Sequence, residues 1–191
     1  MQVKKIPISK IIVPTTRVTA VYDEEMASLL HETLQTMGML QPVVLVQTSD
    51  GYHLVDGLHR LQEKIAAKET VIDAVIYEGE AKEALLMNLV LNRGRGKTKA
   101  SEMVMVMGGL TTEYGLDSDV IAEKTGLTRD YIEKFLRISQ AAPSVIDLLD
   151  QEVIGVGAAY EISRLPTRNQ QNEVCAKSRI YNYTVKELHA L

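Results

Sequence analysis

Residues 118–138 read SDVIAEKTGLTRDYIEKFLRI. A first helix is predicted to end before Gly126, because glycine tolerates the tight turn that must follow. Thr128 stands where its hydroxyl can cap a second helix, and the apolar Ile132 with Phe135 or Leu136 would pack that helix back on the first. This spacing predicts a helix-turn-helix, a motif whose second helix enters the major groove of DNA.

The second helix of this motif would present polar and charged side chains to DNA. Thr128 and Arg129 stand at its N-terminus, where side chains reach base edges, whereas Lys134 lies further along, at a position suited to phosphate. Glu123 and Glu133 would repel phosphate, so a helical hairpin without a DNA role stays open as the alternative. The expected DNA-binding residues are Thr128, Arg129, Asp130, Lys134 and Arg137.

Upstream of this motif, strand-like and helix-like segments alternate over the first 80 residues. The expected strands are 6–13, 42–46, 51–57 and 71–79, with a hairpin turn at 49–51, and the expected helices are 23–38 and 58–69. The first helix carries an apolar stripe of the kind that packs on a core, made of Met26, Leu29, Leu30, Thr33, Leu34 and Met37. Beyond residue 80 the pattern is helical. We therefore expect an α+β chain, with a small mixed α/β domain over 1–92 and an all-helical domain over 93–191.

The composition excludes several classes of protein. Hydrophobic residues make up 46% and charged residues 24% of the 191 residues, the balance of a globular protein rather than of a disordered or collagen-like one. The single cysteine, Cys175, leaves no disulfide framework and no cysteine-based zinc site. No apolar run is long enough for a signal peptide or a membrane helix, so we expect a cytoplasmic protein without membrane contact. The net charge of −4 limits any nucleic-acid contact to a local surface.

A second motif, VDGLHR at 55–60, follows an expected strand and opens an expected helix. Gly57 permits close approach to the backbone, and the first amides of the helix offer hydrogen-bond donors to an anion. His59 and Arg60 add side-chain donors and positive charge. The arrangement suits a phosphate group, although both side chains could instead pair with nearby carboxylates.

Several short motifs follow one another between Ile6 and Leu165. They are Val13-Pro14 through Arg17, Glu32-Thr33-Leu34, Gly38-Met39-Leu40-Gln41-Pro42, Asp56-Gly57-Leu58-His59-Arg60, Leu91-Asn92-Arg93-Gly94-Arg95 with Glu102 beyond it, and the helix-turn-helix. In this order they resemble the ParB family of chromosome and plasmid partition proteins. The resemblance implies a ParB/sulfiredoxin-like N-terminal domain, followed by a helix-turn-helix domain that binds a centromere-like DNA site.

The resemblance also implies a nucleotide site in the N-terminal domain. In the family this domain binds a nucleoside triphosphate, typically CTP, as a switch for DNA loading or self-association in DNA segregation or transcription regulation. The implied partners are DNA, a second copy of the chain and a ParA-type ATPase, with a nucleoid or plasmid location. The residues that match the family's nucleotide site are Gln41, Gly57, Leu58, His59, Arg60, Asn92 and Arg95.

Two positions depart from the family's pattern. The Gly-Glu-Arg-Arg turn of the family is Gly57-Leu58-His59-Arg60 here, which keeps one arginine and replaces the other by histidine. The acidic residue that helps to hold the metal in the family matches Leu91, and leucine cannot ligate a hard cation. This leaves Mg²⁺ binding open and argues against efficient hydrolysis beyond a weak CTPase. We assign no catalytic residue and no metal ligand.

Two other functions stay open. The same N-terminal fold is similar to sulfiredoxin, but sulfiredoxin activity is not one of them. Its nucleophilic cysteine is Leu58 here, and this excludes that activity. It is also similar to a free-serine kinase with an Asp-Gly-His-His-Arg turn, of which Asp56, Gly57, His59 and Arg60 are kept, so a small-molecule kinase is one alternative. The other is an adaptor that binds DNA or protein without nucleotide.

The end of the first domain and the end of the chain give two further expectations. Arg93-Gly94-Arg95-Gly96 places two glycines at the domain junction, which indicates a hinge or a simple turn between helices. ParB-type proteins usually end in a separate dimerisation domain, whereas this sequence stops at Leu191. We therefore expect either a truncated chain or dimerisation through other surfaces.

Overall fold

The computed structural model describes residues 2–92, 98–181 and 183–190. It divides into two compact units, Met1–Lys97 and Thr98–Leu191, and each is described by itself. The predicted hinge at 93–96, which includes the proposed nucleotide contact Arg95, lies outside the described residues.

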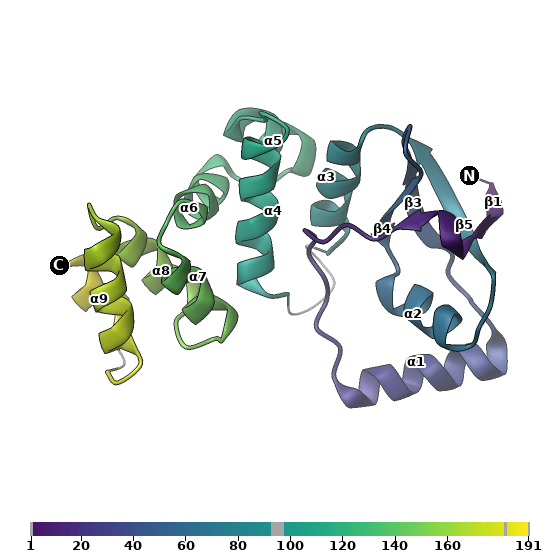
Figure 1. Cartoon of the computed structure of the whole chain (residues 1–191), viewed down its shortest axis with the longest axis horizontal. Coiled ribbons are helices and arrows are strands. Elements are labelled where there is room, and N and C mark those ends of the chain that lie inside the picture. The colour runs from purple at the N-terminus through teal and green to yellow at the C-terminus, as the bar shows by residue number, and fades with distance from the viewer. Residues whose placement is uncertain (1, 93–97, 182, 191) are drawn as a thin grey trace. The chain divides into compact units, whose positions relative to one another are not determined.

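The N-terminal unit is built on a five-stranded sheet with the strand order β1-β5-β3-β4-β2 (Figure 1). The strands are β1 (Val3–Pro7), β2 (Ile11–Ile12), β3 (Val43–Gln47), β4 (Tyr52–Asp56) and β5 (Val71–Glu78). The predicted hairpin is confirmed, since β3 and β4 pair antiparallel and the amide of Thr48 donates to the carbonyl of Gly51 at 2.9 Å.

The expected single strand at 6–13 is wrong. β1 pairs antiparallel with β5 at one edge of the sheet, and β2 pairs parallel with β4 at the opposite edge. Between them the 3-10 helix η1 (Ile8–Lys10) turns the chain away from β5. Pro7 contributes to this break because it has no N–H to donate to a ladder.

Helices cover both faces of the sheet. Neighbouring residues of a strand point to opposite faces, so Val43 and Leu45 of β3 join one hydrophobic cluster and Val46 joins another. The first cluster receives Leu61 of α2 (Leu58–Ala66), and the second receives Ala84 of α3 (Ala81–Asn92). The N-terminus of α2 directly follows β4, which places the VDGLHR turn at the end of a central strand.

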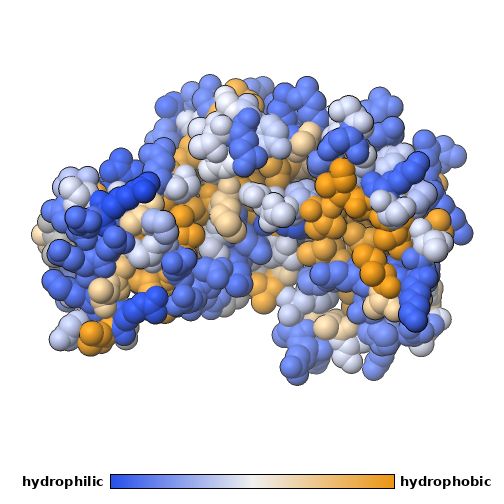
Figure 2. Space-filling view, viewed as in Figure 1, coloured by the Kyte–Doolittle hydropathy of each residue, from blue (hydrophilic) through white to orange (hydrophobic). Residues whose placement is uncertain are grey.

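The apolar stripe of α1 (Glu24–Met37) does not pack on a core. The helix begins as its acidic N-terminus predicts, with the Asp23 carboxylate accepting from the amide of Met26 at 2.8 Å. However, Met26 is 52%, Leu29 64% and Met37 71% exposed, and no residue of the helix is buried. Figure 2 shows hydrophobic surface on the visible face of this unit as well. Periodicity predicted the helix correctly but not its burial.

The C-terminal unit is helical. Its helices are α4 (Ala100–Thr112), α5 (Ser118–Thr125), α6 (Arg129–Ser139), α7 (Pro143–Asp150), α8 (Val156–Ser163), α9 (Arg168–Ser178) and α10 (Val185–His189). α4 packs closely on α6 at Gly108, where an added Cβ would lie only 3.1 Å from the Cβ of Ser139. Among the described residues, no helix has the length and apolar character that would be needed to cross a membrane.

Candidate functional site

The helix-turn-helix is formed by α5 and α6 as the sequence predicts. Gly126 adopts a φ of +68° at the end of α5, and its amide donates to the carbonyl of Ala122 at 2.8 Å. The Thr128 hydroxyl accepts from the amide of Tyr131 at 3.3 Å and so caps α6. Ile132 and Phe135 are buried. The second helix is therefore fixed from its first turn.

Arg129 is held by two carboxylates at the start of α6. Its Nε donates to Glu133 Oε1 at 2.6 Å, and its Nη1 lies 3.0 Å from Asp119 Oδ1. The hydrogen bond to Glu133, together with the charge of Asp119, raises the pKa of this guanidinium above its usual value. Both of these contacts are made at the exposed start of α6.

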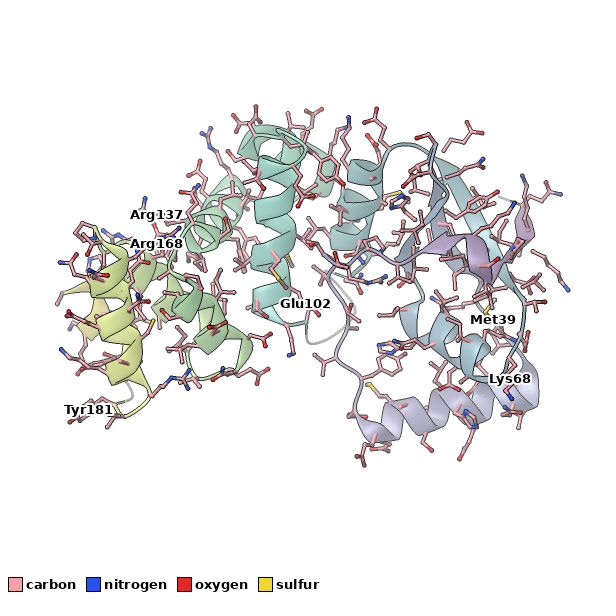
Figure 3. The ribbon with its side chains drawn as sticks, viewed as in Figure 1. Met39, Lys68, Glu102, Arg137, Arg168 and Tyr181 are labelled. Atoms are coloured by element: carbon pink, nitrogen blue, oxygen red, sulfur yellow. The ribbon has the colours of Figure 1, made fainter. Side chains whose placement is uncertain are left out.

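A cleft separates the outer face of α6 from α8. Three of the predicted DNA-binding residues line it, with Glu133, one residue of α8 and the residue that follows α8: the full set is Asp130, Glu133, Lys134, Arg137, Tyr160 and Arg164. The Lys134 ammonium lies 5.5 Å from the centre of the Tyr160 ring. Arg137 projects from α6 and donates through Nε to the carbonyl of Ser163 at 3.2 Å (Figure 3). Sequence reasoning missed Tyr160 and Arg164, because only packing brings α8 beside α6.

In the N-terminal unit, the predicted nucleotide residues that the structure describes converge on one pocket. Its volume of about 300 Å³ lies at the lower end of the range for small-molecule sites, ~300–1,000 Å³. The lining residues are Arg17, Thr19, Ala20, Tyr22, Leu30, Gln41, Asp56, Gly57, Leu58, His59, Arg60 and Asn92. Of the seven predicted residues, only Arg95 falls outside the described part of the chain.

Gly57 makes the entrance to α2 suitable for an anion. It adopts a φ of +98°, and a Cβ at this position would lie 2.8 Å from Cγ1 of Val43, so both conformation and space require glycine. No side chain caps the helix, which leaves its first amides to be satisfied by a ligand or by solvent. The dipole of the helix favours negative charge at the same place.

Arg60 braces the wall of this pocket. Its Nη1 donates to the carbonyls of Gln41 at 2.7 Å and Pro42 at 2.8 Å, and its Nη2 donates to Asp56 Oδ2 at 2.8 Å. The planar guanidinium therefore ties α2 to the segment before β3 and to the end of β4. This agrees with the carboxylate pairing that the sequence left open, and it gives Arg60 a structural task beside any contact with phosphate.

Asn88 positions another wall, and sequence reasoning did not single it out. It is 1% exposed on α3, and its Oδ1 accepts from the amide of Val18 at 2.7 Å. Its Nδ2 donates to the carbonyls of Val18 at 3.0 Å and Val55 at 2.9 Å. This amide holds the segment that carries Arg17 and Thr19 against β4. The one available signal was an asparagine inside the otherwise apolar stretch ALLMNLVL.

His59 and Asn92 are both anchored within the pocket. The ring of Tyr22 stacks on His59 with centroids 4.1 Å apart, and His59 Nε2 lies 3.4 Å from the carbonyl of Ala20. Asn92 is 4% exposed and donates to the carbonyl of Asn88 at 2.9 Å. Leu91 packs with the hydrophobic cluster under α3 and does not line the pocket.

The donor set fits an anion better than a cation held by protein ligands. Asp56 is the one carboxylate among the lining residues, and it is paired with Arg60. Over the described part of the chain, no group of three or more His, Cys, Asp or Glu side chains is placed to hold a metal ion. A Mg²⁺ ion carried by nucleotide phosphates needs few protein ligands, so the residues fit a triphosphate and leave its metal open.

Two family models account for nearly the whole chain. The ParB N-terminal domain matches residues 1–93, and the ParB HTH domain matches residues 99–191. The chain belongs to the ParB family. Its first unit carries the pocket, and its second carries the helix-turn-helix.

Named relatives agree with this assignment. The chain is 28% identical over 167 residues to the probable chromosome-partitioning protein ParB of Neisseria meningitidis, covering 87% of this chain and 58% of that protein. It is 28% identical over 144 residues to chromosome-partitioning protein Spo0J of Thermus thermophilus, covering 75% and 53%. It is 27% identical over 171 residues to the nucleoid occlusion protein of a Geobacillus strain, covering 89% and 61%. The chain thus spans little more than half the length of these relatives.

Solved structures share the fold. The C-terminally truncated ParB of Caulobacter crescentus, complexed to the centromeric parS site, aligns with a TM-score of 0.60 at 17% identity and covers 98% of this chain and 97% of that one. The pNOB8-like ParB N-domain aligns with a TM-score of 0.53 at 13% identity, covering 99% and 94%. These likenesses establish the ParB fold across both units.

For α6 of this ParB-family chain, we predict that Glu133→Gln strengthens DNA binding several-fold at low salt. The substitution removes a negative charge from the cleft and turns the Arg129–Glu133 ion pair into a weaker neutral hydrogen bond. Fluorescence anisotropy with a duplex, at two salt concentrations, measures the change. Glu173→Gln serves as the control, because Glu173 is exposed on α9 and does not line the cleft. An equal gain in DNA affinity in both variants would show that the effect comes from the net charge of the chain and not from the cleft.

Proposed function

We propose that this ParB-family chain binds duplex DNA through α6 and a nucleoside triphosphate in the pocket at the N-terminus of α2. One observation supports the nucleotide site above all. Gln41, the turn at 57–59 and Asn92 are far apart in the sequence, yet they line one pocket beside an uncapped helix N-terminus. By the family resemblance the nucleotide is CTP and acts as a switch for DNA loading or self-association, in DNA segregation or transcription regulation. Hydrolysis, if present, is weak.

The DNA site rests on the formed helix-turn-helix and on the cations of its outer face. Lys134 and Arg137 line the cleft beside α8 and suit phosphate, while Thr128 and Arg129 at the start of α6 suit bases. The partners follow from the family: a second copy of the chain, a ParA-type ATPase, and a nucleoid or plasmid location.

A nucleotide panel tests the first half of this proposal. Calorimetry with CTP, ATP, GTP and UTP, each with and without Mg²⁺, should show binding of at least one triphosphate, with CTP tightest. A metal requirement would show that the nucleotide brings Mg²⁺ into the site. No binding in any combination, with DNA binding retained, would favour the adaptor. Phosphate transfer from a bound triphosphate to free serine would favour the kinase.

The second half is tested by two substitutions on α6. We expect Lys134→Ala to weaken binding to all duplexes alike, since it removes a phosphate contact, and Arg129→Ala to reduce the preference among sequences. Binding to random and genomic duplexes at low salt measures both effects. If no duplex binds, the helix-turn-helix has only a structural role in this chain.

The switch requires coupling between the two sites. By linkage, DNA must change nucleotide affinity by the same factor by which nucleotide changes DNA affinity. Nucleotide affinity measured with and without bound DNA, together with crosslinking between copies, tests this. Equal affinities and no nucleotide-dependent crosslink would show that the two sites are not coupled, and would give no support to a hinge role for residues 93–96.

A further inference from the structure

The nucleotide pocket contains an aromatic pair of a kind that a phosphate site does not need. Tyr22 and His59 stack with ring centroids 4.1 Å apart and an angle of 27° between their planes. Both residues line the pocket, together with the apolar side chains of Leu30 and Leu58. Tyr22 is still 41% exposed, so the stack reaches solvent at the pocket mouth.

The orientation of His59 favours stacking over direct contact with phosphate. Its Nε2 faces the carbonyl of Ala20 at 3.4 Å, which turns one polar edge of the ring towards the backbone. The ring plane is fixed by Tyr22 on one side. The imidazole is thereby held as a flat surface within the first turn of α2.

The same turn carries the anion donors. His59 is the second residue of α2, and the first amides of this helix have no side-chain cap. A flat surface and a set of phosphate donors therefore lie within one helical turn of each other. A nucleotide has the same two parts, an aromatic base and a phosphate chain.

We propose that the base of the bound nucleotide extends the Tyr22–His59 stack, while its phosphates are held at the start of α2. This rests on the proposed nucleotide function and adds Tyr22 as a residue that binds the base. Every base has an aromatic face, so stacking supplies affinity for the base without hydrogen bonds to its edge. Tyr22 contributes its ring rather than its hydroxyl.

The experiment compares a nucleotide with the same ligand lacking its base. Calorimetry with CTP and with ribose 5-triphosphate is carried out on the full chain and on Tyr22→Ala, Tyr22→Phe and Tyr181→Ala. Tyr181 is the matched control because it is an exposed tyrosine of the other unit, beyond α9 (Figure 3). The exposure of Tyr22 makes misfolding of its variants a minor concern, and circular dichroism checks it.

We expect Tyr22→Ala to weaken CTP binding by at least about fivefold, the lower end of the contribution of one base–aromatic stack. Its affinity for ribose 5-triphosphate should stay unchanged, and Tyr22→Phe and Tyr181→Ala should match the unmodified chain for both ligands. Equal weakening of both ligands, or of neither, would overturn the stacking role while leaving the nucleotide site intact. If the unmodified chain binds neither ligand, the nucleotide function itself fails, and the stack with it.

Discussion

Replacing Asn88 by alanine is expected to lower the free energy of unfolding of the N-terminal unit by about 3 kcal/mol. The substitution leaves the amide and carbonyl of Val18 without the partner that now satisfies them, and it removes the shorter of two side-chain hydrogen bonds to the carbonyl of Val55. Each buried polar group that loses its hydrogen bond costs roughly 1–3 kcal/mol. In a unit of this size such a loss lowers the melting temperature by more than about 10 °C.

Two further variants separate the hydrogen bonds from the volume of the side chain. Asn88→Leu keeps most of the volume and still loses the bonds, so we expect it to destabilise the unit as well. Asn172→Ala is the matched control, because Asn172 is exposed and its Oδ1 accepts a single bond from the Ser144 hydroxyl. Calorimetric melting of the full chain measures all three. Full stability of Asn88→Leu would show that packing alone gives Asn88 its role.

Replacing Arg60 by alanine is expected to weaken triphosphate binding at least about tenfold, or ~1.4 kcal/mol, the lower range for a charged hydrogen bond. The loss has two sources. The variant removes a cation from the pocket, and it removes the Arg60 ion pair from the Asp56 carboxylate, which is 7% exposed. That carboxylate would then repel the phosphates.

A double variant distinguishes these two sources. Arg60→Ala combined with Asp56→Asn removes the carboxylate's charge, so any affinity that returns measures the repulsion by Asp56. We expect the double variant to stay at least about tenfold weaker than the unmodified chain, which assigns the remaining loss to Arg60 itself, as a cation and as the brace on the Gln41 and Pro42 carbonyls. Lys64→Ala is the control, since Lys64 is a cation of the same helix that pairs with Glu69 and does not line the pocket. An unchanged dissociation constant in Arg60→Ala would remove Arg60 from the site.

Predictions that depended on neighbours in the sequence agreed with the structure. The turn at Gly126 and the cap at Thr128 are set by contacts within one helical hairpin, and the helical spacing of Ile132 and Phe135 marks the buried face of α6. Glycine's access to positive φ and the hydroxyl cap act over a few residues, so the sequence carries their signal directly. The turn at Gly57 is likewise set by the positive φ that glycine can adopt.

Predictions that depended on distant neighbours were incomplete. The run at 6–13 carries strand propensity along its length, but pairing with β5 and β4 at opposite edges of the sheet divides it. The stripe on α1 has helical periodicity, yet periodicity does not say whether a partner surface exists, and here Leu29 is 64% exposed.

The residue pattern alone predicts two domains of the ParB type, with a helix-turn-helix in the second and a glycine turn suited to phosphate in the first. The surroundings of those motifs depend on tertiary packing. It places Asn88 between Val18 and Val55, stacks Tyr22 on His59, and sets Tyr160 beside Lys134. These pairs are 26 to 70 residues apart or lie on separate elements, so no local propensity encodes them. They follow from the packing of whole helices on a sheet and on one another. Such contacts exist only once the chain has folded.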